Sequence, residues 1–356
     1  MHNRPGLVLG VILLIMAVML TYRNLTREPF ELAERKGHQA SREDYAAGRE
    51  GRTPTFPIAF PLACTLGEDC WIGRYMDRGI GADVQDFMCK ASTQNGHKGT
   101  DFAIADLSRM AEGVAVLAAA SGKVARLRDG MADVSVDKVD EGALDGRECG
   151  NAVVIDHIGG WQTQYCHMKK GSIQVVPGQN VSAGDKIGEI GLSGQTEYPH
   201  LHFSLRHNKM DIDPFDGGHF EQGCDTEKDP LWRERIDYRP VTLMPAQFSA
   251  NPQDKASRWK AGADTLKAEG PGLILTARIF HARTGDTLTF TIKDPTGETF
   301  AEKAVTIDQN RQILTQYFGK KRPIGGFKHG TWRGEIVLRR DGMDDQTQTA
   351  EVSVLP

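Results

Sequence analysis

The sequence lacks the features of a nucleic-acid-binding, zinc-ribbon or thiol-redox protein. Its 43 Lys and Arg residues are outnumbered by 47 Asp and Glu residues, so the net charge of −4 gives no reason to expect nucleic-acid binding. No two of its six cysteines are spaced as Cys-x-x-Cys, which argues against zinc-ribbon and thioredoxin patterns. No internal repeat is found. With 39% hydrophobic and 25% charged residues, the composition is that of an ordinary globular protein.

The sequence also lacks an apolar run of the length that a membrane-spanning helix usually needs. Its most apolar stretch runs from Leu7 to Leu20, after Arg4, and is shorter than the ~20 residues of a bilayer span. That length is typical of a signal-peptide core, but no small-x-small cleavage pattern follows it, which favours a retained anchor over a cleaved signal or a buried helix. Residues 1–28 are therefore predicted to be a signal peptide or membrane anchor. The protein is predicted to be exported to the periplasm, with anchoring to the inner membrane if the segment is retained.

The cysteines agree with export. They all lie in one stretch, and the final third of the chain contains none. An even number in an exported chain predicts up to three disulfides, in any of the fifteen pairings that six cysteines allow. Gly159 and Gly160, between two apolar runs, predict a hairpin. Cys149 and Cys166 flank this hairpin, so a bridge across it is the one pairing that the sequence suggests. The six residues are Cys64, Cys70, Cys89, Cys149, Cys166 and Cys224.

Glycine content and alternating apolar residues indicate a mostly β protein. The chain contains 39 glycines, more than the ~7% of an average protein, as many turns between short strands require. Near the C-terminus, Leu288, Phe290 and Ile292 alternate with threonines, which predicts an immunoglobulin-like β-sandwich. The predicted parts after the N-terminal segment are a polar tether, a glycine-rich and cysteine-rich β domain, a connector and the β-sandwich, at residues 29–55, 56–222, 223–240 and 241–356.

The stretch YPHLHFSLR, at residues 198–206, places two histidines on one face of a predicted strand. Side chains at i and i+2 of a strand point to the same face, so His200 and His202 would lie side by side. Leu201 and Phe203 would point the other way, into a core. Two neighbouring imidazoles can share one small site, where one binds a metal and the other handles a proton. For this pattern alone, two unrelated surface histidines are the alternative.

Two further segments carry residue types suited to the same site. The stretch GHKGTDFAI contains His97 and Asp101, whose side chains would fall on roughly the same side of a strand or helix and suit Zn²⁺. The stretch TQYCHM ends a predicted hairpin strand with His167, for which a structural role is the alternative. A catalytic zinc takes three protein ligands and leaves one place for water, so His97, Asp101 and His202 are predicted to bind one Zn²⁺ ion per chain. His200 and His167 are left free beside it.

Together these segments resemble the lysostaphin/LytM-type zinc metallopeptidases, a family that cuts peptide crosslinks of bacterial peptidoglycan. The matching sequence segments lie between residue 97 and about residue 215. In order, they are HKGTD, GVAVLAAASGKV, GNAVVIDH, YCHM, GLSG and PHLHFSLR…DIDPF. The resemblance implies that residues 56–222 form a compact, mostly antiparallel β metallopeptidase domain with the metal in a groove on the sheet. It also implies that His97, Asp101 and His202 hold zinc. His200 and His167 correspond to residues that act in catalysis.

The residue types suggest a hydrolytic mechanism. One carboxylate and two neutral imidazoles leave a bound zinc ion with a net positive charge, which activates water near neutral pH for attack on an amide carbonyl. His200 is the candidate general base. His167 is the candidate that donates a hydrogen bond to the developing oxyanion or orients the water, although the two roles can be exchanged. Asn151 is a candidate for packing or hydrogen bonding near the groove, but a turn residue is the favoured interpretation.

Three departures from the family's pattern spare the predicted ligands. The usual Gly-Thr-Pro-Val is Gly-Val-Ala-Val at residues 113–116, the glutamate that often follows His-Leu-His-Phe is Ser204, and Cys166 precedes the candidate His167. They leave the shape of the groove open, and with it the choice between a D-alanyl–diaminopimelate crosslink and a glycine bridge.

The predicted function is zinc-dependent hydrolysis of peptidoglycan crosslinks. One alternative is a non-catalytic LytM-like regulator that activates a cell-wall amidase, against which the complete ligand set argues. Another is an adhesion or binding role of the C-terminal sandwich. The predicted partners are peptidoglycan peptide stems and crosslinks, the inner membrane through the N-terminal segment, and a cell-wall protein through the C-terminal domain. No nucleic-acid partner is expected.

Overall fold

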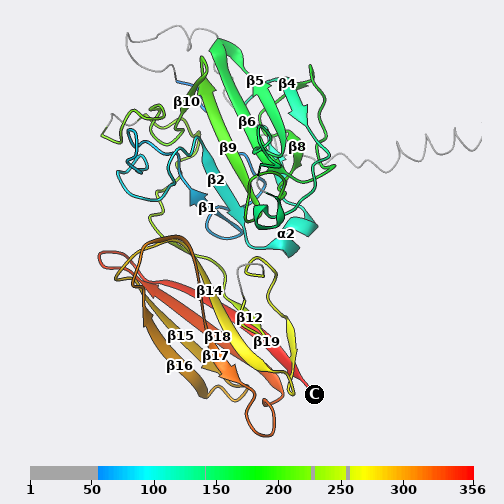
Figure 1. The fold of residues 1–356 in the computed structure, drawn as a ribbon, viewed down its shortest axis with the longest axis vertical. Helices are drawn as coiled ribbons and strands as arrows, with labels where there is room; N and C mark the ends of the chain where they lie inside the picture. The colour runs from blue at the N-terminus through cyan, green and yellow to red at the C-terminus, as the bar shows by residue number, and fades with distance from the viewer. Residues whose placement is uncertain (1–54, 141, 226–228, 254–256) are drawn as a thin grey trace, which may run out of the picture. The chain divides into compact units, whose positions relative to one another are not determined.

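The computed structural model describes residues 55–140, 142–225, 229–253 and 257–356, all within one compact unit, Thr53–Pro356. Its regular structure is almost entirely β, as predicted (Figure 1). The predicted N-terminal anchor and all but the last residue of the predicted tether lie outside the described residues. Among the residues that the structure describes, no helix is long and apolar enough to cross a bilayer.

The predicted metal ligands lie on or beside one antiparallel sheet of eight strands. Its strand order is β1-β2-β9-β6-β5-β4-β7, and β10 also pairs with β9. A two-stranded sheet, a short helix α2 and two 3₁₀ turns accompany it. The strands of the large sheet are β1 (Cys70–Arg74), β2 (Thr100–Ile104), β4 (Gly122–Arg128), β5 (Asn151–Asp156), β6 (Trp161–Met168), β7 (Asn180–Val181), β9 (His200–His207) and β10 (Met210–Ile212). The smaller elements are β3 (Ala115–Leu117), β8 (Lys186–Glu189), α2 (Leu107–Glu112), η1 (Val136–Lys138) and η2 (Ile158–Gly160).

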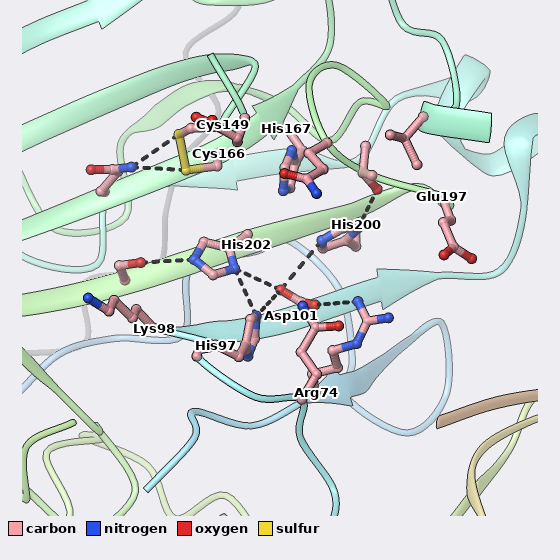
Figure 2. A pocket seen from close by; sticks show the side chains of 18 of the residues that line it. Arg74, His97, Lys98, Asp101, Cys149, Cys166, His167, Glu197, His200 and His202 are labelled. Carbon is pink, nitrogen blue, oxygen red and sulfur yellow. Dashed lines mark hydrogen bonds and ion pairs between the residues drawn. A yellow bond between two sulfur atoms is a disulfide. The ribbon is translucent and has the colours of Figure 1, made fainter. Parts of the chain in front are cut away.

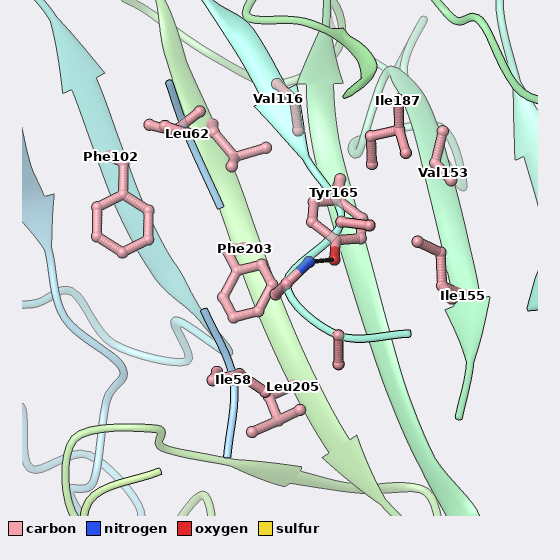
Figure 3. Close-up of a cluster of buried hydrophobic side chains, with 14 of the residues drawn as sticks. Ile58, Leu62, Phe102, Val116, Val153, Ile155, Tyr165, Ile187, Phe203 and Leu205 are labelled. Carbon is pink, nitrogen blue, oxygen red and sulfur yellow. Dashed lines mark hydrogen bonds between the residues drawn. The ribbon is translucent and has the colours of Figure 1, made fainter. Parts of the chain in front are cut away.

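Strand β9 presents one face to the core. Leu201, Phe203 and Leu205 alternate along it, and each is at most 1% exposed. They belong to an apolar cluster with Phe102 of β2 and Tyr165 of β6 (Figure 3). Burying one such side chain stabilises a fold by about 1.5–3 kcal/mol. This apolar face therefore determines on which side of the sheet the two histidines of β9 lie.

The hairpin predicted at two consecutive glycines is confirmed. Strands β5 and β6 pair antiparallel, and η2 joins them. Gly159 and Gly160 have φ values of 69° and 79°, in the left-handed region that residues other than glycine rarely adopt. These two residues allow the tight reversal that brings the end of β6, with His167, back beside β5.

Two further sheets pack around a second apolar core, which is the predicted β-sandwich. Leu288, Phe290 and Ile292 are fully buried along β15, as their alternation predicted. One sheet joins β11, β12 and β17 to the long strand β14, and the other has the order β13-β19-β18-β15-β16. The bounds are β11 (Thr242–Leu243), β12 (Gln247–Ser249), β13 (Thr265–Lys267), β14 (Gly272–Ala282), β15 (Thr287–Lys293), β16 (Thr299–Thr306), β17 (Arg311–Lys321), β18 (Gly330–Arg339) and β19 (Gln346–Leu355).

All six cysteines form disulfides. The suggested bridge between Cys149 and Cys166 is present and crosses from the segment before β5 to β6. The other two bridges join residues that are 6 and 135 positions apart in the sequence, and they are Cys64–Cys70 and Cys89–Cys224.

Removing the long-range bridge is expected to destabilise the protein more than removing the short one. A crosslink restricts the unfolded chain more when it closes a longer loop, so Cys89→Ala with Cys224→Ala should lower the free energy of unfolding by roughly 5 kcal/mol. The matched pair Cys64→Ala and Cys70→Ala should lower it by roughly 2 kcal/mol. Urea unfolding of both variants measures the difference, and a larger loss for the short loop would contradict the loop-closure explanation.

Candidate metal centre

The two histidines of the His-x-His stretch lie on one face of β9, as predicted. Strand β9 pairs with β2 on one side and with β6 on the other. His200 is 3% exposed, and the side chain of His202 is 18% exposed. Because their neighbours Leu201 and Phe203 fill the core, both imidazoles occupy the opposite face of the sheet.

Asp101 and His97 reach the same face from β2 and from the turn before it. Asp101 lies in β2 directly opposite His202 in the strand register. His97 precedes β2 and is not part of a strand or helix, so the expected i, i+4 placement on one regular element is wrong. Its ring meets Asp101 because the backbone turns there, and its own position is fixed by a hydrogen bond to the carbonyl of Tyr75.

Three ligand atoms from these residues form a small triangle (Figure 2). The Nε2 atom of His97 lies 3.0 Å from Oδ1 of Asp101 and 3.0 Å from Nδ1 of His202. The remaining side, between His202 Nδ1 and Asp101 Oδ1, is 2.9 Å. The predicted ligand set is therefore brought together from two segments that are about a hundred residues apart in the chain.

In His97 and His202, the ring nitrogen that points away from the triangle forms a hydrogen bond. The other ring nitrogen therefore presents its lone pair to the triangle. The Nδ1 atom of His97 lies 2.7 Å from the carbonyl oxygen of Tyr75, which only accepts, so Nδ1 carries the proton and Nε2 is free to bind a metal. The Nε2 atom of His202 lies 3.0 Å from Oγ of Ser204, which fixes the ring with Nδ1 facing inward. Ser204 therefore supports the ring at the position where the family often has a glutamate.

The residues present fit a zinc ion. Tetrahedral coordination with zinc–nitrogen bonds of ~2.0–2.1 Å separates ligand atoms by about 3.3 Å, close to the sides of this triangle. A carboxylate oxygen and an imidazole lone pair repel each other at such distances unless a cation or proton lies between them. One carboxylate with two imidazoles is also a donor set typical of zinc sites in hydrolases.

The carboxylate of Asp101 is held in its charged form. Burial alone would raise the pKa of Asp101, but the neighbouring imidazoles of His97, His200 and His202 hold it well below its usual range. Its second oxygen, Oδ2, accepts a hydrogen bond from Nη1 of Arg74 at 3.2 Å. An ionised carboxylate is the form that a divalent cation requires.

Tyr198 is a second donor to Asp101. Its hydroxyl lies 3.3 Å from Oδ2 of Asp101 and is fully buried. Burial raises the pKa of Tyr198 well above its usual value, so the hydroxyl remains protonated and donates. The ring stacks on that of His200, with centroids 4.4 Å apart. Tyr198 thus contacts both the carboxylate and one of the two histidines of β9.

A methyl group at Gly73 is expected to displace Tyr198. A Cβ atom at this position of β1 would lie 2.6 Å from the hydroxyl of Tyr198, a fully buried residue. Gly73→Ala should therefore lower the free energy of unfolding by about 1–3 kcal/mol. Urea unfolding should show a smaller cost in a Tyr198→Phe background, where the clashing hydroxyl is missing; equal costs in both backgrounds would contradict this explanation.

His200 and His167 lie beside the triangle with their rings in contact. Their centroids are 4.7 Å apart, and Nε2 of His200 is 3.4 Å from Oδ1 of Asp101. The Nδ1 atom of His200 faces the carbonyl of Tyr198 at 2.9 Å, and that of His167 faces the carbonyl of Ser193 at 2.8 Å. Because a carbonyl only accepts, each Nδ1 carries the proton, and each Nε2 is left as an acceptor.

His167 is fixed in an unusual backbone conformation. Its φ of 61° is in the left-handed region, which costs energy for a residue with a side chain. Its N–H donates to the carbonyl of Cys149 at 2.8 Å, and the Cys149–Cys166 disulfide holds the same two segments together. Burial lowers the pKa of His167 well below its usual value, and nearby His200 and His202 lower it further, so the ring is neutral near pH 7.

Asn151 differs from its expected place. It was expected in a turn but is the first residue of β5 and is fully buried. Its Oδ1 accepts from the N–H of Met131, and its Nδ2 donates to the carbonyls of Met131 and Met168. Asn151 therefore ties the loop at Met131 to the end of β6, and it does not line the groove.

A polar groove with a cavity volume of about 570 Å³ opens over the triangle. Arg74, Lys98 and Arg206 contribute positive charge to its lining, and Glu148 and Glu197 contribute negative charge. Figure 2 shows Lys98 and Glu197 toward opposite ends of the group of histidines. A lining of mixed charge suits a peptide with several charged groups better than an apolar ligand.

Sequence reasoning missed Arg74 and gave Tyr198 no role. Arg74 carries no local signal, because its contact with Asp101 depends on the pairing of β1 with β2. Tyr198 is two residues before His200 in the same stretch, so its position near the site could be predicted from the sequence. Its hydrogen bond to Asp101 could not be predicted without knowing the register of β2 and β9.

The comparisons with known proteins match the same part of the chain. The family described as Peptidase family M23 matches residues 95–214. A 56-residue stretch is 46% identical to the Peptidoglycan DD-endopeptidase ShyA of Vibrio cholerae, covering 16% of this chain and 13% of that protein. A 58-residue stretch is 34% identical to the Cell division protein DipM of Caulobacter vibrioides, covering 16% of this chain and 9% of that protein.

These matches span only a small part of the curated relatives, 13% and 9% of their lengths. Among solved structures, the catalytic domain of lysostaphin from Staphylococcus simulans is 25% identical. That likeness has a TM-score of 0.26 and covers 40% of this chain and 85% of that chain.

Proposed function

Since residues 95–214 of the chain belong to peptidase family M23, we propose that the protein is a zinc-dependent endopeptidase that hydrolyses peptide crosslinks of bacterial peptidoglycan. The observation that carries this proposal is the triangle of His97, Asp101 and His202 at the base of a polar groove. These three residues would hold one Zn²⁺ ion. When bound, zinc polarises a carbonyl and makes water a better nucleophile near neutral pH.

His200 is the proposed general base. Its Nε2 is the acceptor nitrogen and lies on the side of Asp101, and its Nδ1–H is fixed by the carbonyl of Tyr198. It would take a proton from the attacking water and later pass it to the leaving amine.

His167 is the proposed residue that orients the water. In its neutral form the Nδ1–H donates to the carbonyl of Ser193, so Nε2 accepts hydrogen bonds and has no proton to offer an oxyanion. This supports the second of the two roles expected for His167, because orienting a water molecule needs an acceptor. Exchange of roles between His167 and His200 stays open to experiment.

The proposed substrate is a D-alanyl–diaminopimelate crosslink in the periplasm. Free carboxylates and amines occur along such peptides, and they would complement the cationic and anionic residues of the groove. The similarity to ShyA, a peptidoglycan DD-endopeptidase, supports this bond over a glycine bridge. An oxidising compartment also suits a chain whose six cysteines all pair.

The experiment is digestion of purified sacculi by the whole chain, followed by mass spectrometry of the muropeptides. Sacculi with direct crosslinks should lose dimers and gain monomers, whereas sacculi with glycine bridges should not change. A chelator should stop the reaction, and added zinc should restore it. Stable dimers in every sacculus with zinc-loaded protein would overturn the proposal.

A parallel arm tests the regulator alternative. The same protein is added to a cell-wall amidase acting on sacculi, and released peptide stems are measured. Stimulation of the amidase without any cleavage by the chain alone would favour a non-catalytic regulator, and would make the C-terminal strands a candidate surface for a cell-wall protein.

A further inference from the structure

We infer that Trp259 is a positioning residue for His200 and acts on it through the ring of Tyr198. The inference rests on the proposed function, because it assigns Trp259 a task in the turnover that His200 would carry out. Trp259 precedes β13 and lies outside residues 95–214, which match the peptidase family. A segment beyond the matched domain would therefore help to set the geometry of the site.

Three aromatic rings are stacked in sequence from Trp259 to the site. The rings of Trp259 and Tyr198 are 5.0 Å apart with an interplanar angle of 24°. Those of Tyr198 and His200 are 4.4 Å apart with an angle of 26°. Trp259 is 5% exposed and Tyr198 is fully buried, so Tyr198 is confined between the two other rings. Stacked aromatic pairs favour this offset, nearly parallel arrangement.

Trp259 is itself held by strand β14 and by the segment after β2. The guanidinium of Arg278, a buried residue of β14, lies 5.0 Å from the centre of the Trp259 ring. Its Nη1 donates to the carbonyl of Ala105 at 2.7 Å, just after the strand that carries Asp101. The N–H of Leu107 donates to the carbonyl of Trp259 at 2.9 Å. These contacts fix Trp259 relative to β2.

Neighbouring residues reinforce the same contact. Arg258 forms an ion pair with Glu197, the residue before Tyr198. Phe280 of β14 lies 5.6 Å from the Tyr198 ring and 6.1 Å from that of Trp259, within one apolar cluster. The segment that leads into His200 is therefore supported by both a charge contact and an aromatic contact from the C-terminal strands.

This arrangement would act on turnover more than on metal binding. The His200 ring is held on its Nδ1 side by Tyr198 and Thr196, and on one face by the Tyr198 ring. Loss of the Trp259 ring would allow Tyr198 to shift, and His200 would shift with it. His97 and His202 make no ring contact with Trp259 among the described residues. If the Tyr198 hydroxyl moves away from Asp101, Nη1 of Arg74 remains as a donor to the same carboxylate oxygen, so zinc should be retained.

The test compares Trp259→Leu with Trp259→Phe in the whole chain. Leucine keeps an apolar side chain but removes the flat ring, and phenylalanine restores a flat ring. The matched control is Phe300→Leu, because Phe300 packs edge-on against Trp332 in the sandwich, away from Tyr198. Zinc content, kcat and KM on a crosslinked muropeptide dimer, and the NMR signals of the histidine ring N–H groups are measured for each variant.

We expect Trp259→Leu to keep its zinc and its KM while kcat falls about tenfold, since small displacements of a catalytic group are costly. Trp259→Phe should recover most of kcat, and Phe300→Leu should not change it. The His200 Nδ1–H signal should move in Trp259→Leu and stay in place in Phe300→Leu. An unchanged kcat together with an unchanged His200 signal in Trp259→Leu would overturn the inference.

This design distinguishes a failure of the proposed function from a failure of the inference about Trp259. If the unaltered chain cleaves no crosslink, the proposed function fails and the His200 signal alone decides whether Trp259 positions that ring. If Trp259→Leu does not fold, Trp259→Met is the second variant, since its longer side chain fills more of the space without a flat face. Equal losses of kcat in Phe300→Leu and Trp259→Leu would show a general effect of weakening the C-terminal strands, and would also overturn the inference.

Discussion

Replacing Asp101 by asparagine is expected to abolish zinc retention and hydrolysis together. Oδ1 of Asp101 is the corner of the triangle shared by the two imidazoles, and it is the only anionic member of the set. An amide keeps the shape but removes the negative charge that offsets the cation. It also weakens the contact with Arg74, which pairs with the other carboxylate oxygen. His202→Ala should have the same outcome because it removes a second corner.

The measurement is metal content by mass spectrometry beside muropeptide digestion, with activity expected to fall to the uncatalysed background. The matched control is His207→Ala, because His207 ends the same strand β9 but contacts the carbonyl of Gly159 and the ring of Trp161 instead of the triangle. The control should keep both zinc and activity. Full zinc occupancy in Asp101→Asn would show that the cation is held elsewhere.

Replacing His200 by alanine is expected to leave zinc in place and to lower turnover by roughly 10²–10⁴-fold, the usual contribution of general acid–base catalysis. The triangle does not include His200, whose Nε2 is 3.4 Å from Oδ1 of Asp101. The expected pattern is therefore a loss of kcat with unchanged metal content. Single-turnover digestion of a muropeptide dimer by the zinc-loaded variant measures it.

His167→Ala is the companion variant that separates the two roles. It should also retain zinc, and its loss of turnover should be smaller if His167 only orients the water. A larger loss in His167→Ala than in His200→Ala would mean that the two roles are exchanged. Normal cleavage by His200→Ala would remove His200 from the chemistry altogether.

Much of the site was predictable because it depends on local strand geometry. The two-residue period of a strand placed His200 and His202 on one face and their apolar neighbours on the other, and the structure has this arrangement. The same period predicted the buried residues of β15 in the sandwich. The double glycine predicted the β5–β6 hairpin that carries His167.

The rest depends on contacts between segments that are distant in sequence. The place of His97 is set by the carbonyl of Tyr75, 22 residues earlier, so its loop conformation could not be read from the spacing to Asp101. Arg74 reaches Asp101 through strand pairing, and Trp259 reaches Tyr198 from outside the matched domain. The periodicity of apolar residues within one segment of sequence cannot predict contacts with a distant segment.

Strand β9 contributes both to the apolar core and to the candidate metal centre, so a change in its register would disturb both. Because alternate residues of one strand point to the two faces, inserting or deleting a single residue between His200 and Phe203 would turn the side chains on one side of the change to the opposite face. An imidazole would then point into the core, or Leu201 or Phe203 would point into the groove. Point substitution at a histidine, by contrast, leaves the apolar side intact. A single substitution at His202 would therefore remove the candidate metal centre and keep the fold, whereas a one-residue insertion or deletion within the strand would disrupt both.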